Sequence, residues 1–345
     1  MMSGSPRKLL RFILHPSSFI ILAFLFPAWL SAQEVVRLPA VLPEEQSPPG
    51  QLVSHPDSSS QTVQAPGTGD VAAATEPQLP PGVRNGFFQK LLFDATWLAP
   101  GGANGLGTND EQVQGIFAAP CPTIQSPLVL TPGFAVHYLQ GPQNVDLPPQ
   151  LHEGYVDVRW MSQVTPTLGL DFAVTPSIFS DFEQDSGKAF RMPAHAAAAW
   201  TCNETTKLVL GVAYLDRPDV EWIPIGGIVW TPNDDWKFDL VFPHPKISSR
   251  VYLSDHYDDG TQDWVYLAGE FTGDIWAIRG PLGANERLLL SDYRLILGLE
   301  RRVLGGLTSR VEVGYVFGRR IRFYDTDRPD FDPTDTLMFR GGLSY

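Results

Sequence analysis

The stretch Thr336–Tyr345 has the sequence TLMFRGGLSY, and its pattern decides the fold that we expect for the chain. Apolar side chains recur at every second position, which is the period that a pleated strand imposes. Such a strand has an apolar face of Leu337, Phe339, Leu343 and Tyr345 and a mixed face of Met338, Arg340, Gly342 and Ser344. The stretch therefore predicts a strand between two different environments.

Six further segments repeat this alternation and predict strands of the same kind. Their mixed faces carry glycine, alanine and isolated charges rather than the dense lysine, glutamate and threonine of a solvated sheet, which favours an enclosed lumen. The segments are Phe87–Ala99, Thr167–Thr175, Lys207–Leu215, Trp236–Phe242, Tyr293–Leu299 and Val311–Phe317. We expect Leu297 on the lipid face and Ile296 on the lumen face, where an arginine would be tolerated much better.

The connections between these segments alternate in length. Short links at Val164–Pro166, Cys202–Thr205, Pro232–Asp235 and Arg302–Gly305 interleave with long ones near Gly101–Asp110, Gln140–His152, Phe179–Phe190 and Arg319–Asp335. This asymmetry is typical of up-and-down barrels with short periplasmic turns and long outer loops. We predict an all-β, transmembrane antiparallel barrel of about 14 strands, with 12 as the alternative, because segments near Ile225, Trp236 and Ile247 are short for a tilted spanning strand.

Six tryptophans lie near the ends of the predicted strands: Trp97, Trp160, Trp200, Trp230, Trp236 and Trp264. Aromatic side chains form girdles at the two interfaces of a membrane barrel, so this placement supports the same fold. The alternative is that these tryptophans form the core of a soluble β-sandwich.

The first 32 residues have the organisation of a secretory signal peptide. Arg7, Lys8 and Arg11 precede the apolar run Phe19–Leu30, and Leu30-Ser31-Ala32 offers a cleavage site. An uncleaved membrane anchor is the alternative, although the run is shorter than a spanning helix needs. Residues 33–84 are rich in proline, serine and glutamine and predict a disordered linker. The barrel domain is then expected at 85–345.

Charge and cysteine content restrict the partners further. The chain carries a formal net charge of −13, and loss of residues 1–32 would make it more acidic, so nucleic acid is not an expected partner. Cys121 and Cys202 would enter a compartment that permits a disulfide, and their pairing is left open. Neither cysteine has a local motif that would indicate a thiol catalyst.

Two stretches resemble known bacterial proteins. A terminal strand that closes on an aromatic residue resembles the last strand of outer-membrane β-barrels, which the barrel assembly machinery recognises. The segment Tyr214–Arg250, with DR-x-D, P-x-x-G-x-x-W-x-P and D-x-x-F-P-x-P-K, is similar to an uncharacterised family of outer-membrane β-barrels, a domain of unknown function. GYVFGRR and DTLMFRGGLSY are similar to that family as well. The resemblance implies an exported barrel and no activity.

No serine-hydrolase elbow, zinc helix, phosphate loop or dinucleotide fingerprint occurs in the sequence. The cluster Asp255–Gly260 could serve as a metal or acid/base site, but its composition is also that of an ordinary turn. The acidic loop Asp325–Asp335 has oxygen ligands for Ca²⁺ without the spacing of an EF-hand, so solvated loop charge is the preferred interpretation.

We therefore expect a porin-like channel or small-molecule transporter of the outer membrane, without a cofactor and without enzymatic activity. Its partners would be outer-membrane lipids, the barrel assembly machinery and a small-molecule solute. The alternatives are a structural or adhesive barrel with a filled lumen and an outer-membrane hydrolase. Arg294, Glu312 and Arg340 fall on the mixed faces of consecutive strands, and we expect a lumen charge cluster there because walled-in charges need partners.

Overall fold

The computed structural model describes residues 86–123, 126–183, 186–254, 260–303 and 306–345. The signal peptide and the whole linker predicted above lie outside these residues, as does most of the Asp255–Gly260 cluster. Within the described part, regular structure consists of strands and two short 3-10 helices, Ser186–Lys188 and Pro281–Gly283. No helix of the described residues is long and apolar enough to span a membrane.

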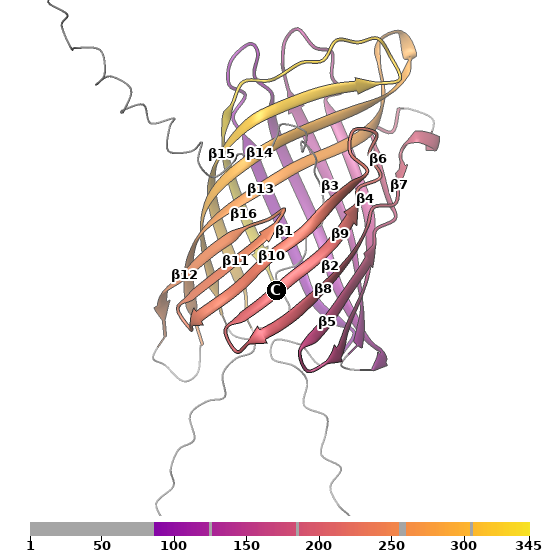
Figure 1. Ribbon diagram of the computed structural model, residues 1–345. Helices are drawn as coiled ribbons and strands as arrows, with labels where there is room; N and C mark the ends of the chain where they lie inside the picture. The colour runs from indigo at the N-terminus through magenta and orange to yellow at the C-terminus, as the bar shows by residue number, and fades with distance from the viewer. Residues whose placement is uncertain (1–85, 124–125, 184–185, 255–259, 304–305) are drawn as a thin grey trace, which may run out of the picture.

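The strands form one sheet (Figure 1), and their bounds are β1 (Phe88–Leu98), β2 (Gly107–Thr123), β3 (Ser126–Gln140), β4 (Gln150–Thr165), β5 (Leu168–Val174), β6 (Ser177–Ser180), β7 (Phe190–Arg191), β8 (Ala194–Asn203), β9 (Thr206–Tyr214), β10 (Trp222–Asn233), β11 (Trp236–Phe242), β12 (Lys246–Leu253), β13 (Gln262–Arg279), β14 (Asn285–Arg302), β15 (Thr308–Tyr324) and β16 (Thr336–Ser344). Neighbouring strands of the ring pair antiparallel, with β5 joined directly to β8, and β16 pairs with β1 to close the ring. Strands β6 and β7 stand outside this ring. The closed ring therefore has 14 strands, which confirms the predicted fold.

The predicted alternation of faces is confirmed in β14 and β16. On β16, Leu337 and Phe339 point outward and are about half exposed, whereas Met338 is fully buried. On β14, Leu297 is 58% exposed and Ile296 only 1%. Ile296 packs against Leu98, Val316 and Met338 inside the barrel. The face assignment was right, but the expected tolerance of arginine at Ile296 was wrong because that side chain is tightly packed.

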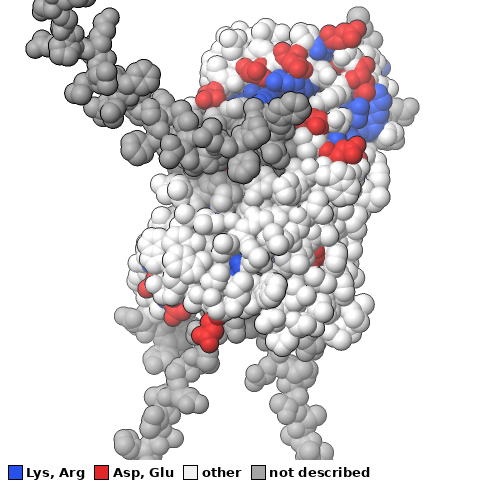
Figure 2. Space-filling model, in the orientation of Figure 1, with Lys and Arg blue, Asp and Glu red and all other residues white. Residues whose placement is uncertain are grey.

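Aromatic side chains form two bands on the outer surface. One band crosses four strands through the ring contacts Phe242–Phe271, Phe271–Tyr293 and Tyr293–Phe317. The other lies near the opposite strand ends and contains Trp160 with Phe172 and Trp230 with Phe238. Between the charged ends of the visible face, uncharged side chains predominate (Figure 2). Two aromatic bands bordering an apolar zone are the pattern of a membrane-spanning barrel.

Trp264 does not belong to these bands, contrary to the prediction. It is 6% exposed and lies on the inner face of β13. The guanidinium groups of Arg250 and Arg302 lie 5.7 and 5.3 Å from its ring centroid. Its position near a strand end could not reveal which way the side chain points.

The two ends of the barrel differ, and we call the end at which β6 lies the head. The long strands β2–β4 and β13–β15 rise above the short wall made by β5 and β8–β12 (Figure 1). There β6 pairs with β4 over His152–Tyr155 and meets β13 where Ser180 lies beside Ala277. The loop after β15 adds a bridge between Ile321 and Phe331. These contacts close a smaller ring above the short wall.

The smaller ring is filled with apolar side chains, as expected where a barrel is only wide enough to hold its own side chains. We call this set the head core: Leu106, Leu151, Phe179, Trp276, Ile278, Leu288, Ile321 and Phe323. Leu139, Val145, Leu147, Leu290 and Phe331 pack around it.

The opposite end, where Tyr345 lies, is called the mouth. The links between β4 and β5, β8 and β9, and β10 and β11 at the mouth are two residues long.

Candidate functional site: the barrel lumen

Below the head core the barrel is hollow. A cavity of 1770 Å³ reaches from Trp276 and Leu139, at the underside of the head core, to Lys90, Asn233 and Tyr345 at the mouth. Its wall is formed by the inner faces of the ring strands, as the mixed faces of the sequence predict. The lumen is therefore filled at the head and open in its larger, lower part.

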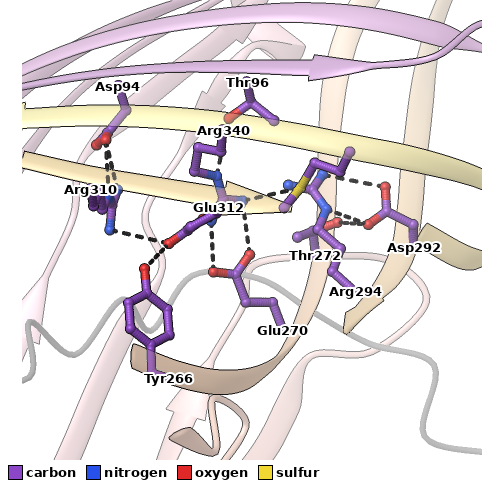
Figure 3. A network of polar contacts seen from close by, with 11 residues as sticks. Asp94, Thr96, Tyr266, Glu270, Thr272, Asp292, Arg294, Arg310, Glu312 and Arg340 are labelled. Carbon is purple, nitrogen blue, oxygen red and sulfur yellow. Dashed lines mark hydrogen bonds and ion pairs between the residues drawn. The ribbon is translucent and has the colours of Figure 1, made fainter. Parts of the chain in front are cut away.

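The two sides of this cavity differ in chemistry. Strands β8–β11, with the first residue after β9, contribute an apolar wall of Ala197, Val209, Ala213, Leu215, Ile223, Ile225 and Val241. Ala197, Val209, Leu215 and Val241 of this set line the cavity itself. Strands β13–β16 and β1 contribute most of the polar contacts drawn in Figure 3. The lumen thus has an apolar wall and a charged wall.

The charged wall is organised as a transverse row of residues that are register neighbours. Tyr266 on β13, Gly298 on β14, Glu312 on β15, Arg340 on β16 and Thr96 on β1 lie side by side across five strands. Tyr266 Oη donates to Glu312 Oε1 at 2.5 Å, and Arg340 Nη1 donates to Glu312 Oε2 at 2.9 Å. Arg340 Nε also donates to Thr96 Oγ1 at 3.1 Å. One row of side chains therefore ties five strands together.

Glycine makes this row possible. A Cβ atom on Gly298 would lie 2.2 Å from the Tyr266 ring, so the absent side chain is what allows Tyr266 to cross β14 and reach Glu312. Gly342 acts in the same way between Asp94 and Arg310, whose side chains meet over it with Nη2–Oδ1 at 2.7 Å. The glycines seen on the mixed faces of the sequence therefore provide space for long polar side chains to bond across a strand.

Of the three residues predicted to cluster, Glu312 and Arg340 are brought together, and Arg294 has other partners. Arg294 Nε donates to Asp292 Oδ1 at 2.7 Å. In the register of β14 with β15, Arg294 faces Val316, while Glu312 faces Gly298. The pairing is shifted by four positions from the expected one because the turn after β14 is longer than the residues 302–305 suggested.

Sequence reasoning missed Glu270, the second carboxylate on Arg340. Its two oxygens accept from Arg340 Nη1 and Nη2, both at 2.9 Å (Figure 3). Glu270 lies on β13, and two strands separate it from β16. The alternation of β13 could have placed Glu270 on the inner face, but barrel curvature decides which long side chains meet across two strands.

Similar ion pairs occur on the opposite side of the lumen. Arg159 donates through Nε and Nη2 to the two oxygens of Asp171. His195 Nε2 lies 3.5 Å from Asp171, and His137 Nδ1 lies 3.0 Å from Asp110. Charges in the middle of the lumen are thus largely matched, as burial of ionic groups requires.

The DR-x-D stretch of the sequence anchors the loop between β9 and β10. Asp216, with a positive φ of 52°, accepts from the backbone N–H of Met192 at 2.8 Å. Arg217 is 4% exposed, bonds Asp219 and donates from Nη1 to the carbonyl oxygen of Gly273 at 2.5 Å. These contacts fasten the short wall to the side of the head.

The acidic loop after β15 is held by cations. Asp330 and Asp332 lie 3.2 and 2.7 Å from Arg322. Asp325 accepts hydrogen bonds from Arg287 and Lys188. These bonds hold the pKa of Asp325 below its usual range, and the bond from Arg287 has the largest effect. Among the described residues, no group of three or more histidine, cysteine, aspartate or glutamate side chains could hold a metal ion.

Cys121 and Cys202 are both exposed and free. They lie within β2 and β8, near the mouth ends of these strands, rather than in turns. No described contact places either thiol beside an acid or base of the lumen.

Comparison with known proteins gives only distant similarity. No protein-family model matches the chain, so membership of the uncharacterised family stays a prediction, and no curated protein matches either. A bacterial polysaccharide outer-membrane secretin is 10% identical, with a TM-score of 0.36 over 74% of this chain and 97% of that chain. The monoaromatic hydrocarbon channel TodX, as its deltaS2 mutant, is 11% identical, with a TM-score of 0.36 over 74% of this chain and 88% of that chain.

Proposed function

We propose that the protein is an outer-membrane channel or transporter for a small polar or amphipathic solute, in a conformation closed at the head. The observation that carries this proposal is the 1770 Å³ cavity beneath the head core. A barrel with a purely structural role has no need to hold an internal space lined by charged side chains. A cavity of this size holds a small molecule with its water, since ligand sites commonly occupy about 300–1000 Å³.

The head core would act as the closed gate. Its side chains are apolar, so an ion or polar solute would lose its hydration on entering them. The ring that surrounds the head core stands above the aromatic band that contains Phe271 and Tyr293. Its closing element is the short strand β6, whose Phe179 packs on Trp276 with 5.9 Å between ring centroids. Displacement of β6 would join the cavity to the outside without breaking the 14-stranded ring.

Location is tested first. We expect fractionation to place the protein in the outer membrane, with the heat-modifiable gel mobility of folded barrels. Recovery as a soluble periplasmic protein would contradict the proposal. Assays of folded protein on ester and peptide substrates test the hydrolase alternative, and we expect no turnover.

Conductance in planar bilayers tests transport itself. We expect rare openings of the wild-type protein and frequent openings of Phe179→Ala, which removes a ring from the head core. Phe238→Ala, on the outer aromatic surface beside Trp230, is the matched control and should behave as wild type. Absence of conductance from all three proteins, each confirmed as folded, would favour the structural barrel.

A further inference from the structure

The inner surface of the mouth carries an arc of basic side chains. Six of them, each within four residues of the mouth end of its strand, face the cavity from six of nine neighbouring strands: Lys207 on β9, Lys237 on β11, Arg250 on β12, Arg302 on β14, Arg310 on β15 and Lys90 on β1. We call this set the basic arc. The chain as a whole has a net charge of −13, so the arc is not a consequence of composition.

Three members of the basic arc have carboxylate partners. Arg250 lies 2.8 Å from Asp235, Arg302 lies 2.6 Å from Glu300, and Arg310 bonds Asp94. The Asp235 side chain is 62% exposed, so water screens that pair strongly. Arg250 and Arg310 thereby join different strands and turns, whereas Arg302 and Glu300 lie on the same strand, β14.

The other three members of the basic arc do not join elements of the fold through ion pairs with described residues. Within the described residues, no carboxylate lies within ion-pair distance of Lys90, Lys207 or Lys237. Deeper in the lumen, by contrast, Arg340, Arg294 and Arg159 are all paired. Lysine at these three positions adds positive charge to the cavity entrance and forms no ion pair with the residues that the structure describes.

Acidic groups near the basic arc reduce the positive electrostatic potential that it produces. Glu204 and Asp234, in the turns at the mouth, and Asp239, one step deeper than Lys237, also line the cavity. Residues 255–259, in the link between β12 and β13, lie outside the described part of the chain. Glu204 and Asp234 lie in turns at the rim, whereas the lysines lie on the inner strand faces, where solute must pass. Lysine and arginine side chains that line a pore favour anions.

We propose that the basic arc is a binding site for small multivalent oxyanions, carrying phosphate or carboxylate groups, that enter the lumen from the mouth. Lys90, Lys207 and Lys237 supply the free positive charge of this site. The site deepens the proposed function, since it names the class of solute that the channel would take. Binding at the mouth does not itself require the head to open.

Equilibrium dialysis of radiolabelled inorganic pyrophosphate against the full-length folded protein tests the site. The test variant is Lys90→Gln/Lys207→Gln/Lys237→Gln. The control variant, Lys188→Gln/Arg279→Gln/Arg320→Gln, removes three positive charges at the head end, outside the cavity lining. Heat-modifiable mobility confirms that each variant is folded.

We expect wild type and control to bind pyrophosphate alike and the test variant to bind about tenfold more weakly or worse, from the loss of three solvated charge contacts. Wild-type binding should weaken as salt rises from 20 to about 300 mM because the lysines are hydrated. No binding by wild type at low salt, or equal binding by the test variant, would overturn the proposal. Binding without conductance would instead leave the site standing and count against the channel.

Discussion

Replacement of Arg340 should destabilise the barrel more than replacement of Glu312, although the two side chains bond each other. Arg340 serves two carboxylates at once, with two bonds to Glu270 and one to Glu312, and it also donates to Thr96. Glu312 accepts from Tyr266 and from Arg340. Loss of the arginine therefore leaves two carboxylates without their main cation, whereas loss of the Glu312 charge leaves Arg340 paired with Glu270.

The magnitudes follow from burial. The Glu312 side chain is 4% exposed, and removal of one partner from such a buried ion pair costs about 3–5 kcal/mol. The Glu270 side chain is 26% exposed, so water offsets part of its loss, and Arg340→Gln should stay within that range. Glu312→Gln preserves shape and can still accept from Tyr266. Its cost should be that of one charged hydrogen bond, about 1.5–3 kcal/mol.

The measurement is urea unfolding in lipid vesicles, followed by tryptophan fluorescence and by loss of heat-modifiable mobility. Thr131→Arg is a suitable control, because Thr131 lines the cavity on the other side and is only partly buried. Equal losses for the two network variants, or a loss below about 1 kcal/mol for Arg340→Gln, would refute the assignment of Arg340 as the centre of the network.

Three further predictions test faces, spacing and charge. Leu297→Arg, on the lipid face, should cost about 2–4 kcal/mol or abolish assembly, whereas the lumen variant Thr131→Arg should be mild; similar damage from both would contradict the facing. Gly298→Ala should break the hydrogen bond between Tyr266 and Glu312, which crosses over Gly298, and should slow assembly. Gly341→Ala should do neither, because nothing lies within 4 Å of the added carbon. The lowered pKa of Asp325 means that its ion pairs stabilise the head above the ordinary pKa of aspartate and are lost as pH falls through the lowered one. Proteolysis of the head on acidification should therefore rise in wild type and change less in Asp325→Asn.

Much of the barrel could be predicted from the sequence because each of its strands has one face toward lipid and one face toward the lumen. Lipid outside and lumen inside impose a period of two, so the faces of β16 and the outward position of Leu297 follow from the pattern. The shortness of β11 and β12 was also visible near Trp236 and Ile247, but the segment near Ile225 was wrongly expected to be short, since β10 has 12 residues. These features depend on single strands and require no knowledge of which residues meet.

The head and the charge network could not be read in the same way. Strand β6 is four residues long, pairs with β4 rather than with its neighbour β5, and meets the distant β13 at one position, so no local period marks it. The partner of Arg340 depends on register and curvature, which is why Glu270 was missed. Arg294 was expected beside Glu312, but the register of β14 with β15 places it opposite Val316, four positions further along. Trp264 shows the same limit, since an aromatic residue near a strand end suits a girdle as well as a lumen.

The DR-x-D loop yields the last prediction, because its contacts give this conspicuous stretch of sequence a structural role. Arg217 satisfies the carbonyl oxygen of Gly273, on a part of β13 that β12 does not reach, since their pairing ends at Ala268. Unpaired strand edges attract other chains or fray, so a buried guanidinium at this edge stabilises the junction of wall and head. Arg217→Gln should therefore free the loop between β9 and β10.

Limited proteolysis with an enzyme that cleaves at aspartate measures this release, because Asp216 and Asp219 flank the altered position. We expect cleavage there to become at least about fivefold faster, as an ordered loop with a buried anchor becomes locally unfolded. Arg301→Gln removes an exposed ion pair with Asp263 at the mouth and should leave the loop protected. If the loop stays as resistant in Arg217→Gln as in Arg301→Gln, packing of Leu215 and Val220 in the apolar wall, rather than the guanidinium, holds the short wall to the head.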